Sequence, residues 1–274
     1  MADTTIDDLF QQAEAIGKDE GTPIFSDAAM DVMNSMALDY GLQLNAGLGL
    51  APADMKAEDP LLVAFVLDNS GSIDGIVDGP AAVCEGHKLY LDTLSESKEK
   101  NGILVGTWLL NDILPIHPFV TLDNATRLVA GTNYSARGMT PLYRKVCEVL
   151  SILNLKMQVE YFDAGCTCRA ILVVVTDGND QDYNITKART AAECKTLAQE
   201  LGELLIIQFM GISDGVTPFE DVAISMGVSA NQIMLPGADP HEIRAAFDLA
   251  SRSALSASQS ADTFSQVAMN GFVT

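Results

Sequence analysis

Residues 61–74 read LLVAFVLDNSGSID, and this stretch decides the fold. An apolar run ends abruptly at Asp68, Ser70 and Ser72, whose oxygen-bearing side chains stand at alternate positions. A continuous apolar run bounded by turn residues is typical of a parallel strand that is buried on both faces of its sheet. Ligands of open α/β sheets bind in the crevice outside the carboxyl ends of the strands. We therefore expect the functional site directly after this strand.

The rest of the chain alternates between strand-like and helix-like patterns. Strands are expected at Leu61–Asp68, Ile103–Leu110, Cys168–Thr176, Leu204–Met210 and a short Gln232–Leu235, with Ile116–Leu122 as an antiparallel edge strand. Helices are expected at Ala81–Lys98, Thr140–Tyr161, Thr186–Gly202, Phe219–Met226 and His241–Ser256. Because several strands are rich in Val, Ile and Leu throughout, helices should cover both faces of the sheet. The alternation predicts an α/β fold with a doubly wound, mostly parallel sheet.

The N-terminal part of the chain has a different pattern. Thr5–Lys18 has apolar residues near helical spacing, and a second helix-like segment with a Met-rich stripe opens at Ser26. Asn45–Pro60 reads as a linker. We expect an N-terminal helical arm and linker at 1–56, a main domain at 57–260 and a C-terminal tail at 261–274. A Met-rich stripe is more often core packing than a partner groove, although an adaptable arm of this kind suits either role.

Charge and composition exclude several classes of protein. The chain of 274 residues has a net charge of −21, which argues against a nucleic-acid binder and against docking on an anionic membrane. The acidic start has no apolar segment typical of a signal peptide, and no stretch approaches the ~20 apolar residues of a membrane helix. The five cysteines are odd in number and sparse, which is typical of reduced thiols in a cytoplasmic protein.

Polar groups from three parts of the chain should meet at one edge of the sheet. Asp177 ends a second apolar strand, ILVVVTDGND at 171–180, and Thr140-Pro141 reads as a helix N-cap followed by proline. Together with Asp68, Ser70 and Ser72, these residues supply carboxylate and hydroxyl oxygens, which select Mg²⁺, Ca²⁺ or Mn²⁺ over zinc or copper. Because only two ligands are charged, the cation keeps open positions, and a carboxylate from another molecule can fill one of them.

This set of residues resembles the von Willebrand factor A (vWA) domain. Asp68-Asn69-Ser70-Gly71-Ser72, then Thr140 in GMTPLY, then Asp177 in VVVTDG look like its complete metal-ion-dependent adhesion site, in the right order. The resemblance covers about residues 60–256 and implies a Rossmann-like fold. It implies Ser70, Ser72 and Thr140 as direct or switchable ligands of the cation. Asp68 and Asp177 would then act through bound water.

The same resemblance implies a non-enzymatic protein-interaction module in which a partner Asp or Glu completes the metal sphere. The Ser-rich run AFDLASRSALSASQS at 246–260 resembles the last helix of bacterial intracellular vWA proteins of tellurium-resistance and stress operons. An AAA+ ATPase or an operon-encoded stress protein is the partner that this resemblance implies. The expected setting is the cytoplasm of a bacterium or of a phage-infected cell.

Other interpretations remain open. Each motif alone is compatible with local structure: a strand-to-helix turn at DNSGS, a helix cap at Thr140 and an Asp-Gly turn at Asp177. A metal-dependent phosphoester hydrolase on a similar sheet is one alternative, but the only basic residues near the loops are Arg137 and Arg144, and phosphoryl transfer needs cationic help. A structural or assembly role for residues 1–56 is another.

Overall fold

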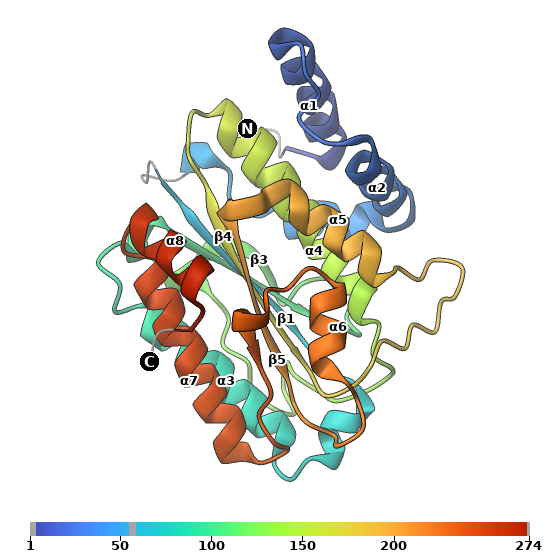
Figure 1. Cartoon of the computed structure of the whole chain (residues 1–274), viewed down its shortest axis with the longest axis vertical. Helices are drawn as coiled ribbons and strands as arrows, with labels where there is room; N and C mark the ends of the chain where they lie inside the picture. The colour runs from blue at the N-terminus through green and yellow to red at the C-terminus, as the bar shows by residue number, and fades with distance from the viewer. Residues whose placement is uncertain (1–3, 55–58, 273–274) are drawn as a thin grey trace.

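The sheet is doubly wound and mostly parallel, as predicted. The computed structural model describes residues 4–54 and 59–272. Its six strands lie in the order β3-β2-β1-β4-β5-β6 (Figure 1), and only β3 runs antiparallel to its neighbour. The strands are β1 (Leu61–Leu67), β2 (Ile103–Leu109), β3 (His117–Thr121), β4 (Arg169–Thr176), β5 (Leu205–Gly211) and β6 (Ile233–Met234). The expected antiparallel edge strand is thus confirmed as β3.

Helices cover both faces of this sheet. Leu62, Ala64 and Val66 of β1 enter one core, and Val63 and Phe65 enter the other, because successive side chains of a strand point to opposite faces. The first face is covered by α4 (Leu142–Leu155), α5 (Ala191–Leu201) and α6 (Phe219–Ser225). The second is covered by α3 (Gly79–Leu94), α7 (Pro240–Ala257) and α8 (Ala261–Asn270). None of the described helices combines the length and apolar character that a bilayer crossing requires.

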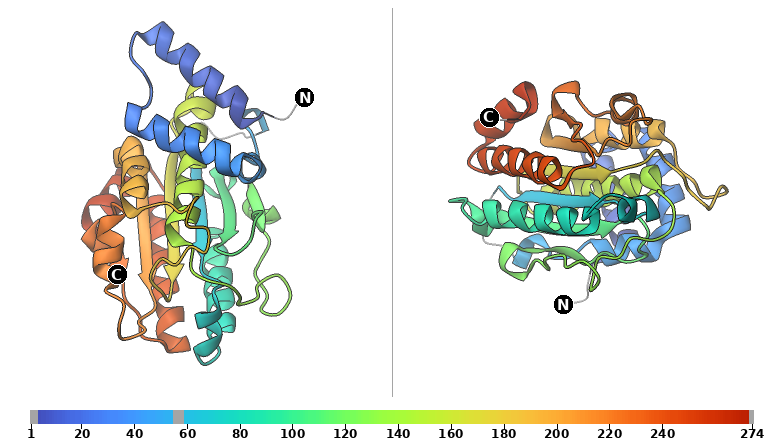
Figure 2. Two further views of the ribbon diagram at one scale, coloured as in Figure 1. Left: turned by 90° about the vertical axis from the view of Figure 1, so that its right-hand side faces the viewer. Right: turned by 90° about the horizontal axis from the view of Figure 1, so that it is seen from below.

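The N-terminal arm packs on the domain. It consists of α1 (Ile6–Glu20) and α2 (Asp27–Gly47), which lie against α4 at one end of the molecule (Figure 2). Met33 and Met36 are fully buried in the same core as α4, so the Met-rich stripe is core packing. The expectation of a linker from Asn45 is wrong at its start, because α2 continues to Gly47 and the Leu50 amide donates to the Phe119 carbonyl at 2.9 Å. Residues 55–58 of that stretch lie outside the described residues.

Several helix boundaries differ from the predicted ones, and α8 was not predicted. α5 begins at Ala191 and not at Thr186, because Thr190 and Glu193 form a capping box. α4 ends at Leu155, and the chain continues as a π-helix, Lys156–Tyr161. Within the predicted tail, α8 forms because Ser260 caps it and because Phe264 and Val267 are buried in the second core.

Candidate metal site

The serines and one aspartate of the predicted site meet at the carboxyl edge of β1 and β4. These two strands are neighbours, so Asp68 and Asp177 follow adjacent strands. The Ser70 and Ser72 hydroxyl oxygens lie 2.9 Å apart. Both hydroxyls reach the same carboxylate oxygen, Asp177 Oδ1, at 3.3 Å from Ser70 and 2.9 Å from Ser72. Three side-chain oxygen atoms from two loops therefore converge on one point.

Asp68 holds the loop in shape and is fully buried. Its Oδ1 accepts a hydrogen bond from the Ser70 amide at 2.7 Å, and its Oδ2 accepts one from the Thr176 hydroxyl at 2.7 Å. The Tyr134 hydroxyl donates to the Asp68 carbonyl. Since both carboxylate oxygens already accept hydrogen bonds, Asp68 is suited to orienting the ligand loop. Sequence reasoning missed both residues, although Thr176 stands inside the quoted segment VVVTDG and Tyr134 lies shortly before GMTPLY.

Thr140 reaches the same edge from the loop before α4. Its carbonyl accepts a hydrogen bond from the Gln181 amide at 2.7 Å, which ties it to the loop after β4. Its hydroxyl oxygen lies 3.3 Å from the place where a Cβ at Gly178 would stand. Glycine at position 178 therefore leaves room for the Thr140 hydroxyl beside Asp177.

The predicted helix cap at Thr140 is wrong. Pro141 occupies the N-cap position of α4 and makes no capping hydrogen bond with its side chain. Asp180 supplies the cap, because its Oδ1 accepts a hydrogen bond from the Tyr143 amide at 3.0 Å. The Thr140 hydroxyl is therefore not used to cap α4.

Asn69 ties the loop that carries Ser70 and Ser72 to the turn after β2. Its Oδ1 accepts a hydrogen bond from the Asn111 amide at 2.9 Å, and its Nδ2 donates to Asp112 Oδ1 at 3.3 Å. Its carbonyl accepts a hydrogen bond from the Arg137 amide at 2.6 Å. This loop is therefore held on both sides, by the turn after β2 and by the segment before α4.

The site carries two carboxylates in a buried setting. Burial raises the pKa of Asp68, against the opposing effect of its hydrogen bonds with Ser70 and Thr176. Burial, followed by repulsion from Asp68, raises the pKa of Asp177 to about 6. Both shifts show that the charged forms are disfavoured, and a cation beside Asp177 would offset this cost.

The donor set fits a hard divalent cation. Among the described residues, no group of three or more His, Cys, Asp or Glu side chains could hold a metal ion. A cation here therefore depends on the hydroxyls of Ser70, Ser72 and Thr140 together with carboxylates, and oxygen ligands of this kind are suited to Mg²⁺, Ca²⁺ or Mn²⁺.

A groove opens beside these oxygens. It has a volume of about 670 Å³, and Ser72, Thr140 and Asp177 line it. The other lining residues are uncharged except Asp214: Gly75, Ile76, Gly178, Asn179, Gln181, Ile212, Ser213, Val216, Thr217, Pro218 and Ala238. No Lys, Arg or His occurs among these described lining residues. A segment of another molecule that enters the groove meets the candidate ligands directly.

The two arginines near the loops are already engaged. Arg137 pairs with Asp112. Arg144 Nε lies 2.9 Å from Asp182 Oδ2, and its guanidinium lies between the rings of Tyr40 and Tyr183. The structure therefore does not place either guanidinium among the residues that line the groove.

Comparison with known proteins identifies the fold and no more. No protein-family model and no curated protein matches this sequence. The pilus adhesin SpaC from Lactobacillus rhamnosus GG is similar in structure, with 13% sequence identity and a TM-score of 0.54 over 74% of this chain and 31% of that chain. Its open conformation gives 15% identity and a TM-score of 0.52 over the same shares, 74% and 31%. This chain thus spans less than a third of the length of SpaC.

Two more distant matches complete the comparison. The SpRpn10 VWA domain gives a TM-score of 0.45 at 11% identity, over 68% of this chain and 93% of that chain. The manganese-loaded Plasmodium vivax TRAP protein gives 0.42 at 16% identity, over 69% of this chain and 73% of that chain. The likeness to SpaC shows a shared fold. The doubly wound sheet and the ordered motif at its carboxyl edge are together consistent with the vWA fold that the sequence led us to expect.

Proposed function

We propose that this protein is a divalent-cation-dependent protein-interaction module whose bound metal is completed by an Asp or Glu of the partner. One observation carries the proposal: the Ser70 and Ser72 hydroxyls converge on Asp177 Oδ1 within 3.3 Å, at the wall of an open groove. A cation held at this point is accessible to a carboxylate that enters from the groove. Mg²⁺ is the proposed resident ion, with Ca²⁺ or Mn²⁺ as alternatives.

The roles of the residues follow from their contacts. Ser70, Ser72 and Thr140 would contact the ion through their hydroxyl oxygens. Asp177 would contribute charge at its edge, and Asp68 would orient the ligand loop from its buried position. Because hydroxyls are weak, uncharged ligands, the ion retains Lewis acidity, which favours a further anionic ligand. A carboxylate of another protein supplies that ligand without any covalent chemistry.

The groove favours this proposal over the phosphoester hydrolase. Its described lining has no Lys, Arg or His, and Arg137 and Arg144 are paired with aspartates. Phosphoryl transfer relies on such cations to stabilise the charge of the transition state. Hydrolysis of an aryl phosphate with Mg²⁺ or Mn²⁺ that Asp68→Ala abolishes would instead support the enzyme.

The cellular setting is part of the proposal. Most of the Ser-rich run at 246–260 lies in α7, which ends at Ala257. This run is the feature that favours a bacterial stress-operon protein. We place the protein in the cytoplasm, with an AAA+ ATPase or an operon-encoded stress protein as partner. An assembly role through the arm is less favoured, because its Met-rich face is already buried on α4.

Binding of Mn²⁺ tests the metal site directly. Electron paramagnetic resonance measures the free Mn²⁺ in titrations of the wild type, Ser72→Ala and Ser265→Ala. Both serines are exposed, so neither substitution should disturb the core, and Ser265 lies on α8, far along the chain from the site. Affinity should fall at least tenfold for Ser72→Ala and stay unchanged for Ser265→Ala. Equal affinity in all three proteins would refute the site.

Affinity capture tests the metal bridge. The same three proteins are used as baits with Mg²⁺ and with a chelator, and the captured proteins are identified by mass spectrometry. A partner bridged by the metal should be present with the wild type and Ser265→Ala in Mg²⁺ and absent with Ser72→Ala or with chelator. Identical sets of captured proteins under all conditions would exclude the bridge.

A further inference from the structure

The groove beside the candidate metal site contains one charged residue outside the set of candidate ligands, Asp214. We propose that the partner segment that reaches the metal also carries a Lys or Arg, which binds Asp214 a few residues away from the metal-binding Asp or Glu. Because the segment is the one that completes the metal, this step rests on the proposed function and names the chemical class of the partner.

Asp214 lies close to Asp177 along the edge of the sheet. Asp177 follows β4, and Asp214 follows the neighbouring strand β5. The pairing continues past the end of β5, because the Ile212 amide donates to the Thr176 carbonyl at 2.8 Å, which places Ile212 beside Asp177. For an extended chain with strands about 4.8 Å apart and about 3.3 Å per residue, Asp214 then lies about 8 Å from Asp177. An extended partner segment spans this separation with about two or three residues.

The Asp214 carboxylate is oriented by its own loop and keeps an acceptor site for a ligand. Its Oδ1 accepts hydrogen bonds from the Val216 amide at 2.8 Å and the Thr217 amide at 2.7 Å, and its Oδ2 accepts one from the Thr217 hydroxyl at 2.6 Å. A carboxylate has about four acceptor sites, so one site on Oδ2 is left for an external donor. Although burial opposes the shift, these hydrogen bonds lower the pKa of Asp214, so it stays charged at neutral pH.

The charge of Asp214 is not neutralised within the groove. The described lining contains no Lys, Arg or His. Asp214 is exposed, so a partner reaches it without any opening of the fold. Asp74, next to the lining residue Gly75, is exposed as well, in a chain with a net charge of −21. The field at the groove therefore attracts a cation and disfavours a second carboxylate, which matches a segment with one acidic and one basic residue.

The rest of the groove favours uncharged residues in the remainder of the segment. Ile76, Val216 and Pro218 supply apolar surface to the lining, and Val216 is 87% exposed. Removal of such surface from water stabilises a complex. The segment is therefore expected to carry apolar residues beside its two charges.

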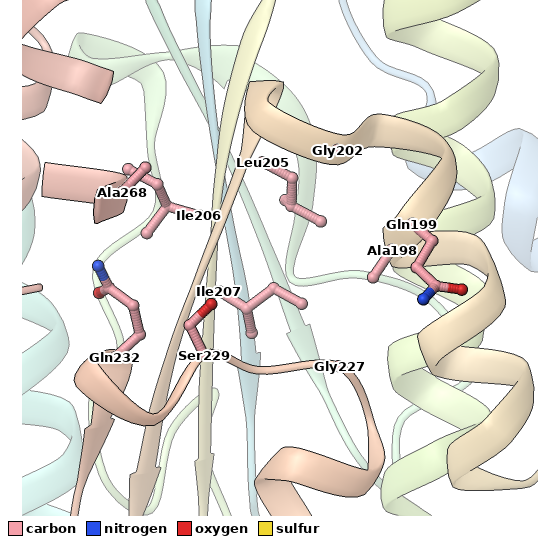
Figure 3. A pocket seen from close by; sticks show the side chains of 10 residues that line it. All are labelled: Ala198, Gln199, Gly202, Leu205, Ile206, Ile207, Gly227, Ser229, Gln232 and Ala268. Atoms are coloured by element: carbon pink, nitrogen blue, oxygen red, sulfur yellow. The ribbon is translucent and has the colours of Figure 1, made fainter. Parts of the chain in front are cut away.

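The cavity at the beginning of β5 does not match such a segment. It has a volume of about 220 Å³, and Figure 3 shows Ala198 and Gln199 of α5 on one side of it and Gln232 and Ala268 on the other. All of its lining residues in the described chain are uncharged, so a charged side chain there would lose its hydration without gaining a charged partner. The charges of the partner therefore favour the groove at the other end of the strand.

Selection from a peptide library tests this class of partner. A phage library of random nine-residue peptides is panned on the full chain in Mg²⁺, and bound phage is released with a chelator, which selects metal-dependent binders. Enriched peptides should combine one Asp or Glu with one Lys or Arg at a separation of about two or three residues. Fluorescence anisotropy of the labelled synthetic peptides then gives their affinities.

Substitutions of Asp214 test the contact itself. Asp214→Asn keeps an acceptor for the loop and should weaken peptide binding about fivefold at low ionic strength, as expected for an exposed ion pair. The matched control Asp19→Asn removes the same charge from an exposed position of α1 and should leave binding unchanged. Asp214→Lys should reverse the preference, so that peptides with Glu in place of the basic residue bind more tightly than the selected ones.

The outcomes separate this proposal from the one on which it rests. If the chelator releases no peptide, or if Ser72→Ala binds the peptides as tightly as the wild type, the metal bridge fails and the role of Asp214 fails with it. If the chelator releases peptides that lack a basic residue, or that bind Asp214→Asn as tightly as the wild type, only the role of Asp214 is overturned.

Discussion

Lowering the pH from 7.5 to 5.0 should reduce the free energy of unfolding through the protonation of His87. The ring is fully buried on α3, with Nε2 at 3.2 Å from the Thr107 hydroxyl and the Phe65 ring 4.8 Å from its centroid. Burial, reinforced by the positive charges of His117 and Arg127, lowers the pKa of His87 from 6.5 to about 3. The unfolded chain therefore takes up a proton in this pH range and the folded chain does not.

The sign and size of the change in stability follow from this difference in proton uptake. Stability from a neutral His87 is fully present above pH 6.5 and is lost as the pH falls toward 3. At about 1.4 kcal/mol per pH unit below the unfolded pKa, the loss at pH 5.0 is about 2 kcal/mol. Urea unfolding followed by circular dichroism gives the free energy of unfolding at both pH values.

His87→Gln isolates this contribution, because glutamine stays uncharged at both pH values. The raised pKa values of Asp68 and Asp177 have the opposite effect on stability as the pH falls. This effect is the same in both proteins, so it cancels in the comparison. The wild type should lose about 2 kcal/mol more than His87→Gln on acidification. If both proteins lose the same free energy, or if the His87 ring titrates near pH 6 in the folded state, the reasoning is refuted.

Two further substitutions test the packing. Met33→Ala should lower the free energy of unfolding by about 2–5 kcal/mol in urea unfolding, because Met33 is fully buried between the arm and α4. Leu38 is 88% exposed on the same helix, so the control Leu38→Ala should change this free energy by about 0.5 kcal/mol at most. Gly86→Ala should lower the free energy of unfolding by about 1–3 kcal/mol in the same assay, because the added Cβ would stand 2.1 Å from the Phe247 ring. At Gly75 an added Cβ meets nothing within 4 Å, so the control Gly75→Ala should not show this loss.

The strands around the site follow from the sequence with little ambiguity. β1 is apolar at every position, and β4 is apolar from Ala170 to Val175. A sheet with helices on both faces is the structure that buries both sides of such strands. Because parallel strands end at one edge, the polar residues after each run were expected to meet there. The hydrogen bonds that join Ser70, Ser72 and Asp177 confirm this expectation.

The starts of α5 and α8 are marked by capping residues in the sequence, but the apolar pattern alone did not predict them. Thr190 and Glu193 form a capping box that fixes the start of α5, and the same spacing is present in the sequence. Ser260 caps α8 in the same way. Local signals of this kind fix where a helix begins more reliably than the extent of its apolar pattern does.

The sequence alone determined the α/β class, the doubly wound and mostly parallel sheet, and the oxygen-rich character of the candidate site, since these depend on residue type and local order. Only the tertiary structure decided that Asp180 and not Thr140 caps α4, because the capping contact joins residues 37 positions apart. The docking of the arm on α4 was likewise decided by packing between distant segments. Local pattern does not specify which helix faces and which loops of distant segments pack together.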